Sequence, residues 1–225
     1  MQPYFFPYFP YWQLIYAADK FIIFDDVNYK KKGFINRNYI SSHGFKKFFT
    51  LELVGASQNK LISDIKIGKN RDLLLKRIAH DYKNAPFYDL AFPIIETIFK
   101  HDEENLARFL AFSMSTICRY LEISTPVINS SSLNKKADLK GASKVLGICK
   151  LLNADYYINP IGGLQLYNTN FFESQSVKLQ FLKAGDLTFK GPTGFDQNIS
   201  ILEILLYNDV STIKNALPNY SLIEV

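Results

Sequence analysis

The hydrophobic pattern at the start of the chain predicts a loop, a helix and a buried strand in succession. Prolines interrupt positions 1–10, which excludes a regular helix or a central strand, so we expect an ordered loop there. Apolar side chains then recur at helical spacing from Tyr11 to Ala18. The apolar run 21–24 predicts a short buried strand that ends at an acidic pair.

The middle of the chain has the apolar spacing of helices. Three helices are predicted within residues 69–121, and Ala85 and Pro86 separate the first from the second. Pro93 is expected in the first turn of the second helix, where the N–H that proline lacks has no helical partner. This section therefore differs from the segments on either side of it.

Strand-like segments flank the helical section. They lie at 46–54, 65–67, 126–128, 156–158 and 177–181. A helix is predicted at 142–152, and Ser200 with Glu203 has the spacing of a capping box, which predicts a terminal helix from about residue 201. This order predicts an α/β fold with a mixed sheet flanked by helices, and no linker or repeat divides residues 1–225 into separate domains.

Composition excludes two broad classes of protein. The 225 residues are 48% hydrophobic with a net charge of only +5, which argues against a disordered chain. No stretch approaches the roughly 18 apolar residues of a membrane-spanning helix, and the first residues have no basic segment typical of a secretory signal. Cys118 and Cys149 lie in helical apolar patterns, which predicts buried thiols and a cytoplasmic protein.

The positive charge is concentrated in one segment. Residues 30–51 contain six Lys or Arg and no acidic residue. Arg37 can form a bidentate contact with an anion such as a nucleotide diphosphate, and Lys31 and Lys32 can add point charges. A solvated turn is the alternative for the lysines, and RNA binding through the basic patch and its aromatic neighbours is another. Asn36 and Asn38 flank Arg37 and share its anchored position.

Asp25 and Asp26 are the candidate catalytic residues. They follow a predicted buried strand, and ligands of α/β proteins bind at the carboxyl ends of the strands. One carboxylate could act as a base, or hold a sugar hydroxyl or a cation. The alternative is a carboxylate that caps the turn by accepting backbone N–H groups.

A second candidate binding segment follows the strand predicted at 156–158. Gly162 and Gly163 would let backbone approach a ligand closely, although a tight turn is the alternative and no dinucleotide or Walker spacing is present. Tyr157 and Tyr167 flank the glycines and could stack on a sugar or a base, with core packing as the default. These residues do not identify a reaction.

Other catalytic chemistry has little support in the sequence. His43, His80 and His101 are far apart and lack partners at metal-ligand spacing, so we expect no metal site. No GxSxG motif occurs, and the two cysteines lack the exposed, electropositive setting of a nucleophile. The residues identify no cofactor.

The first 40 residues resemble the opening segment of the WbqC-like family. The resemblance is carried by Gln2-Pro3-Tyr4, by Asp25-Asp26-Val27 and by Asn36-Arg37-Asn38, and weaker similarities continue to 200–205. Family members usually have a few residues before Gln-Pro that form a first strand. We therefore expect the true start to lie upstream of Met1.

The resemblance implies a role in bacterial surface-polysaccharide (O-antigen) biosynthesis. Some family members are described as glycine or acyl transferases that act on an amino sugar. The implied function is transfer of an acyl or aminoacyl group to a nucleotide-linked amino sugar, with Asp25 or Asp26 as base and Gln2 and Tyr4 orienting the substrate. Lys31, Lys32 and Arg37 would then hold the diphosphate, and Asn36 and Asn38 would help to orient the sugar.

Two other functional classes are considered. The protein could be a non-catalytic nucleotide-sugar-binding protein that partners a glycosyltransferase. A nucleotidyltransferase-like protein is disfavoured because no His-x-x-His motif lies near the start. Nucleic acid would be a partner if the donor were an aminoacyl-tRNA.

Overall fold

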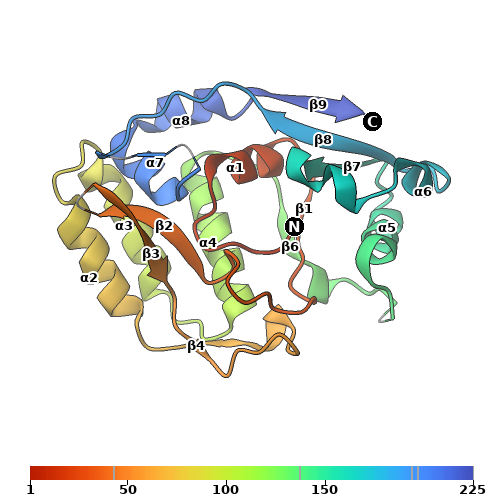
Figure 1. Cartoon of the computed structure of the whole chain (residues 1–225), viewed down its shortest axis with the longest axis horizontal. Helices are drawn as coiled ribbons and strands as arrows, with labels where there is room; N and C mark the ends of the chain where they lie inside the picture. The colour runs from red at the N-terminus through yellow and green to blue at the C-terminus, as the bar shows by residue number, and fades with distance from the viewer. Residues whose placement is uncertain (43, 137, 194, 197, 225) are drawn as a thin grey trace.

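Short strands and helices alternate along the chain and form several small sheets instead of one continuous sheet (Figure 1). The computed structural model describes residues 1–42, 44–136, 138–193, 195–196 and 198–224. The α/β class predicted from the sequence is confirmed. Among the described residues, no helix is long and apolar enough to cross a membrane.

A parallel pair of strands lies at the centre of the molecule. β1 (Phe21–Ile23) pairs with β6 (Val127–Asn129), although about a hundred residues separate them in the chain. Met1 lies on the other edge of β1, where its amino nitrogen donates to the Ile22 carbonyl at 2.8 Å and its carbonyl accepts from Phe24 N at 2.7 Å. Because β1 and β6 run in the same direction, the polar residues that follow each strand meet at one edge.

Two antiparallel pairs follow β1 in the sequence. β2 (Arg37–Ser42) and β3 (Phe45–Thr50) form a hairpin, and β4 (Leu53–Val54) pairs with β5 (Lys66–Ile67). The prediction of one strand over 46–54 is therefore wrong. Residues 51–52 separate the two strands: Leu51 N still bonds the Asn36 carbonyl opposite it, whereas Glu52 N bonds the Asn70 side chain at 2.9 Å.

The three predicted central helices are confirmed. They are α2 (Arg71–Tyr82), α3 (Tyr88–Lys100) and α4 (Leu106–Tyr120). Pro93, however, lies inside α3 and not in its first turn. The helix begins earlier because the turn after Pro86 is closed by backbone bonds, including Ala91 N to Phe87 O, and because Tyr88 and Phe92 stack with ring centroids 4.6 Å apart.

The last third of the chain forms a three-stranded mixed sheet with helices beside it. β7 (Tyr156–Pro160) runs parallel to β8 (Lys178–Ala184), and β9 (Tyr220–Glu224) pairs antiparallel with β8. The helices are α5 (Gly141–Leu151), α6 (Thr169–Glu173), α7 (Ile201–Tyr207) and α8 (Val210–Ala216). Short 3-10 turns occur at η1 (Ile62–Asp64), η2 (Ser130–Ser132) and η3 (Ile161–Leu166).

The start of α7 is capped by only half of the predicted capping box. Ser200 Oγ accepts a hydrogen bond from Leu202 N, as expected for an N-cap. Glu203 does not reach back to the helix start, because its carboxylate accepts hydrogen bonds from Ser41 N and Tyr82 Oη. A buried contact between distant elements thus replaces the local one.

The aromatic residues near the N-terminus divide between the core and a cavity wall. Phe5, Phe6 and Trp12 are fully buried, and Phe5 stacks on Phe49 with ring centroids 4.7 Å apart. Residues 1–8 form the loop that the prolines predict, and α1 (Phe9–Tyr16) follows it. Tyr4 and Tyr8 line the cavity described next.

Candidate functional site

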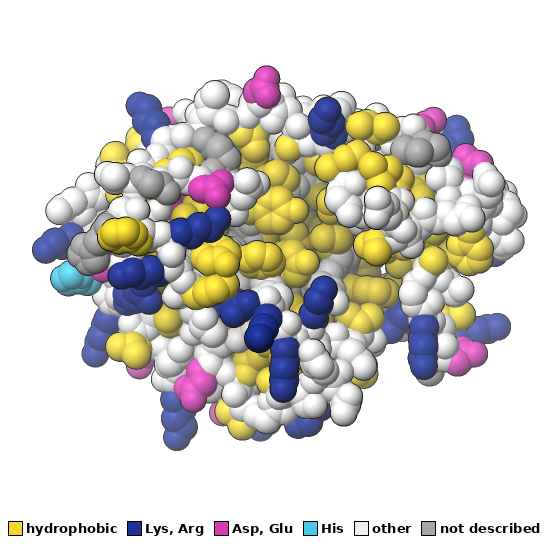
Figure 2. Space-filling view, viewed as in Figure 1, with side chains coloured by type: hydrophobic (Ala, Val, Ile, Leu, Met, Phe, Trp, Pro, Cys, Tyr) yellow, Lys and Arg dark blue, Asp and Glu magenta, His cyan; other side chains and the backbone are white. Residues whose placement is uncertain are grey.

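A cavity of about 980 Å³ lies between the N-terminal half of the fold and the β7–β8–β9 sheet. One wall comes from the N-terminal loop, the end of α1 and β1. The facing wall comes from α5, β7 and η3. Figure 2 shows a hollow lined mainly by hydrophobic side chains in this part of the molecule. Its volume is within the range of small-molecule sites.

Five of the residues predicted for substrate binding line this cavity. They are Gln2, Tyr4, Tyr157, Gly162 and Gly163. The Tyr157 hydroxyl lies 3.3 Å from that of Tyr167 and 3.4 Å from Asn159 Oδ1, and burial raises the pKa of Tyr157 well above its usual value. Tyr157 is therefore neutral at physiological pH and acts as a hydrogen-bonding group.

The two glycines differ in what surrounds them. A Cβ at Gly163 would overlap the side-chain amide of Asn159, so any larger residue there requires that amide to move. A Cβ at Gly162 would meet no atom within 4 Å. The close approach predicted for the pair is thus made at Gly163, and the neighbour is Asn159.

Asp25 is buried and fully engaged in holding the turn after β6. Its carboxylate accepts hydrogen bonds from Asn129 Nδ2 at 2.9 Å, Ser131 N at 2.9 Å and Ser131 Oγ at 2.6 Å. Asp25 is 1% exposed to solvent. These contacts join the ends of β1 and β6, which is a positioning role.

Asp26 faces a different set of partners, two nearly buried lysines. Its Oδ2 lies 2.7 Å from Lys135 Nζ and 3.0 Å from Lys144 Nζ, and these lysine side chains are 8% and 10% exposed. Burial alone would raise the pKa of Asp26, but the two ammonium groups outweigh it and hold the pKa below its usual value. Asp26 is therefore ionised at neutral pH.

Unsatisfied polar atoms remain in this cluster. Asp26 Oδ1 and Ser130 Oγ are buried without a hydrogen-bond partner among the residues that the structure describes. Buried polar atoms usually have partners. Ser130 is one of the hydrogen-bonding neighbours that lower the pKa of Asp26, so its hydroxyl lies beside that carboxylate and the two atoms are not independent sites. Neither Asp25 nor Asp26 lines the cavity, and nor do the two lysines. The link is Phe24, which lines the cavity and whose ring centroid lies 5.4 Å from Lys144 Nζ.

Lys135 and Lys144 are not among the residues predicted from the sequence. Lys135 lies in the polar stretch after β6 and Lys144 lies in α5. Each is more than a hundred residues from Asp26 in the chain. The sequence does show that two short apolar strands, β1 and β6, are each followed by polar residues. Only their parallel pairing reveals that these ends meet.

The structure does not bring the basic segment and its asparagines into the cavity. Lys31 and Lys32 are exposed, and Arg37 donates to the carbonyls of Gly33 at 3.2 Å and Lys32 at 2.6 Å. Among the described residues of this segment, only Lys30 lines the cavity.

Asn36 and Asn38 bond to other parts of the protein. Asn36 accepts from Tyr29 Oη and donates to the Leu51 carbonyl. Asn38 is buried, and its amide donates to the carbonyls of Phe5 and Phe6 at 3.1 and 2.7 Å. Asn38 thus attaches the N-terminal loop to β2.

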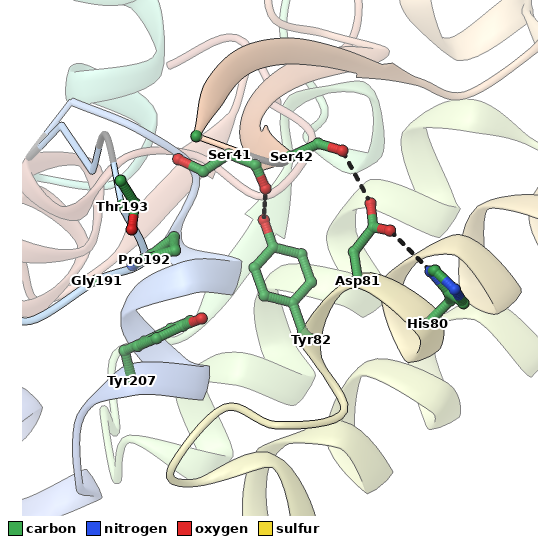
Figure 3. Close-up of a pocket in the computed structure, with 10 residues that line it drawn as sticks. Ser41, Ser42, His80, Asp81, Tyr82, Gly191, Pro192, Thr193 and Tyr207 are labelled. Carbon is green, nitrogen blue, oxygen red and sulfur yellow. Dashed lines mark hydrogen bonds and ion pairs between the residues drawn. The ribbon is translucent and has the colours of Figure 1, made fainter.

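A second cavity, of about 510 Å³, lies between β2, α2 and the start of the loop before α7 (Figure 3). Ser42 Oγ donates to Asp81 Oδ2 at 3.2 Å, and His80 Nδ1 lies 3.1 Å from Asp81 Oδ1. The carboxylate thus stands between the serine and the histidine. In a hydrolase triad the histidine holds the middle position, so this arrangement does not activate Ser42.

The thiols and the two described imidazoles are not assembled into a reactive site. Cys118 and Cys149 are buried free thiols, as predicted, and burial raises their pKa values to about 12 and about 11. No group of three His, Cys, Asp or Glu side chains within the described ranges is arranged to hold a metal ion. His43 lies outside the described residues.

The fold and the site define an α/β protein with a polar cluster where parallel strands end. The model of the WbqC-like protein family matches residues 2–215, and the chain belongs to that family. It is 25% identical over 205 residues to "Uncharacterized protein Rv1507c" of Mycobacterium tuberculosis, a match that covers 88% of each chain. No solved structure matches the chain significantly.

Proposed function

We propose that this protein is a cytoplasmic transferase that joins an acyl or aminoacyl group to the amine of a nucleotide-linked amino sugar, for surface-polysaccharide biosynthesis. The observation that carries the proposal is the cavity of about 980 Å³ beside the cluster of Asp26, Lys135 and Lys144. Tyrosine rings suit a sugar ring, and Lys30 at the cavity suits a phosphate.

The reaction requires a nucleophilic amine and an acceptor for its proton. The amine nitrogen attacks the donor carbonyl, a C–N bond forms, and the bond from the carbonyl to the leaving group breaks. The nitrogen is cationic after attack and therefore far more acidic than the free ammonium. Asp26 can accept that proton through Oδ1 even though its pKa is low.

The two lysines would contribute positive charge where the carbonyl oxygen becomes negative. Lys135 and Lys144 are already held by Asp26, so little reorganisation is needed during the reaction. Asp25 would act as a positioning residue, since its oxygens hold Asn129 and Ser131. Gln2, Tyr4, Tyr157 and the backbone at 162–163 would bind the sugar.

A non-catalytic nucleotide-sugar-binding protein is the second candidate. It is favoured by the low pKa of Asp26, which makes this residue a weak base, and by the complete engagement of Asp25. In that case the same cavity binds the ligand and no bond changes. The two candidates make the same prediction for sugar binding and different predictions for turnover.

Thermal shift of the full chain with UDP-glucosamine tests the binding that both candidates require. At a ligand concentration about a hundred times Kd, we expect roughly 2.7 kcal/mol of stabilisation. UDP-N-acetylglucosamine is the control, because its amine is already acylated. The proposal would be contradicted if neither ligand stabilised the protein.

Mass spectrometry of the amide product then separates the enzyme from the binding protein. With an acyl-coenzyme A or an aminoacyl-tRNA as donor, the enzyme converts UDP-glucosamine and the variant Asp26→Asn does so at least about tenfold more slowly. Asp102→Asn, at an exposed aspartate far from the cluster in the sequence, is the matched control. Sugar binding without product for any donor would favour the binding protein.

A further inference from the structure

An exposed surface of cations and aromatic rings covers the loop before β2 and the β2–β3 hairpin. We call it the basic aromatic surface. Figure 2 shows Lys and Arg side chains grouped next to the hydrophobic hollow in this region. Its members are Lys30, Lys31, Lys32, Phe34, Arg37, Tyr39, Lys46 and Phe48.

Strand alternation explains why aromatic rings remain exposed there. Asn38 and Ile40 of β2 point inward and are buried, so Tyr39 between them points outward. Tyr39 pairs with Phe48 of β3, which is 39% exposed. This face of the hairpin is therefore aromatic and open to solvent.

The rings and cations form a stacked row. The Arg37 guanidinium lies 4.0 Å from the centroid of Phe48, and Phe48 stacks on Tyr39 at 4.1 Å with an interplanar angle of 26°. Lys46 Nζ lies 4.7 Å from the Tyr39 centroid. Such cation–π stacking keeps the rings in place while leaving the charges near solvent.

Most of the charge on this surface is unbalanced. Lys46 is paired with Asp196 at 2.8 Å. No carboxylate of the described residues forms an ion pair with Lys30, Lys31, Lys32 or Arg37. An anionic partner would complete the charge balance.

The basic aromatic surface is continuous with the cavity. Lys30 lines the cavity, and the ring of Phe34 lies 5.9 Å from that of Tyr4, which lines it as well. A ligand on the hairpin could therefore place one end beside the proposed sugar site.

We propose that this surface binds the single-stranded 3′ end of an RNA, and that the donor in the proposed reaction is an aminoacyl ester carried by that RNA. This inference rests on the proposed function. Arg37 and Ser41, the partner of Lys46, are four residues apart on β2, or roughly 13 Å. That spread exceeds a single diphosphate and suits successive phosphates, while exposed rings suit unpaired bases.

The chemistry balances without another reactant. The sugar amine attacks the ester carbonyl of the RNA 3′-terminal ribose, a C–N bond forms and the ester C–O bond breaks. The ribose oxygen leaves with the bonding electron pair and takes up the proton that the nitrogen loses. The products are an amide and an RNA with a free terminal hydroxyl.

Fluorescence anisotropy of the full chain with a labelled single-stranded RNA ending in CCA tests the inference. We expect binding that weakens steeply with added potassium chloride, by about 0.7 in logarithmic slope for each phosphate contact. Lys31→Glu/Lys32→Glu should weaken binding at least about tenfold and flatten the slope. Phe48→Ala should weaken binding without changing the slope, because it removes stacking only.

A matched charge change provides the control. Lys178→Glu/Lys183→Glu alters the net charge equally, at exposed positions of β8 on the other side of the molecule (Figure 1). Equal effects of the two double variants would overturn the inference. So would the absence of RNA binding at low salt. Binding to coenzyme A or to phosphatidylglycerol vesicles, but not to RNA, would overturn it as well. If the protein binds UDP-glucosamine but not RNA, only this inference is rejected. If it binds RNA but not UDP-glucosamine, the proposed function is rejected.

Discussion

Adjacent residues in this protein have separate roles. Asp25 and Asp26 lie just beyond β1, after Phe24, yet Asp25 bonds to Asn129 and Ser131 and Asp26 to two lysines. Neighbours on a strand would point to opposite faces, but β1 ends at Ile23, so both carboxylates lie beyond the strand at one edge. Of these two residues, only Asp26 retains a buried carboxylate oxygen without a hydrogen-bond partner among the described residues.

Glu203 offers a pH-dependent test at the residue scale. Burial raises its pKa above the usual 4.5, although the bonds from Tyr82 and Ser41 oppose this. The unfolded chain therefore ionises first as pH rises, and stability falls from about pH 4.5 up to the folded pKa. We expect the Tm of Glu203→Gln to match that of the parent near pH 4 and to exceed it at pH 8. Each kcal/mol of added stability should raise Tm by roughly 2–4 °C in a chain of this size.

Thermal melts of both proteins across this pH range measure the effect. Asp102→Asn, at an exposed residue, should show no such divergence. A difference between Glu203→Gln and its parent that is the same at pH 4 and pH 8 would show that ionisation of this carboxyl does not affect stability.

At the element scale, η3 forms one wall of the cavity. It follows β7 directly, and its Gly163 is the point where backbone and the Asn159 side chain approach. Asn159 in turn lies within 3.4 Å of the Tyr157 hydroxyl. A change at this glycine therefore reaches the residues proposed to bind the sugar.

We expect Gly163→Ala to destabilise the protein by about 1–3 kcal/mol, because the added methyl group overlaps the Asn159 amide. Gly162→Ala is the matched control and should change stability little, since its Cβ meets no atom within 4 Å. Chemical denaturation measures both. Equal stability of the two variants would contradict the assigned contact.

On the scale of the whole molecule, the candidate site depends on the pairing of distant segments. β1 and β6 bring residues 25–26 beside residues 129–131, and α5 adds Lys144. Lys144 Nζ also donates to the Asp26 carbonyl at 2.6 Å. Three parts of the chain are thus joined by one small polar cluster.

Replacing the central carboxylate should weaken this connection. We expect Asp26→Asn to lose about 1–3 kcal/mol at neutral pH, because two nearly buried ammonium groups lose their counter-charge. The pKa of Asp26 is lowered in the folded state, so its stabilisation is complete above about pH 3.8 and disappears as pH falls through the folded pKa.

Denaturant unfolding of Asp26→Asn and its parent at neutral and acidic pH checks this expectation. The gap between the two proteins should narrow at the acidic end. A gap that stays constant with pH would mean that the effect arises from packing and not from charge.

Local patterns predicted much of the secondary structure. The helical spacing within 69–121 and the buried run at 21–24 gave correct elements, because burial of one face imposes a period that is visible in the sequence. Pro93 and the stretch 46–54 were misread, because the deciding contacts, at the 85–87 turn and at Glu52, involve backbone groups and leave no such period.

The sequence by itself determined the α/β class, the buried thiols, the proline-rich loop and the family. Each depends on local spacing or on a contiguous motif. Only the tertiary structure decided that Asn36 and Asn38 bond within the protein, that Glu203 leaves its helix end, and that Lys135 and Lys144 meet Asp26. The physical reason is that side-chain partners far apart in the chain are chosen by strand pairing and packing, which local periodicity does not encode.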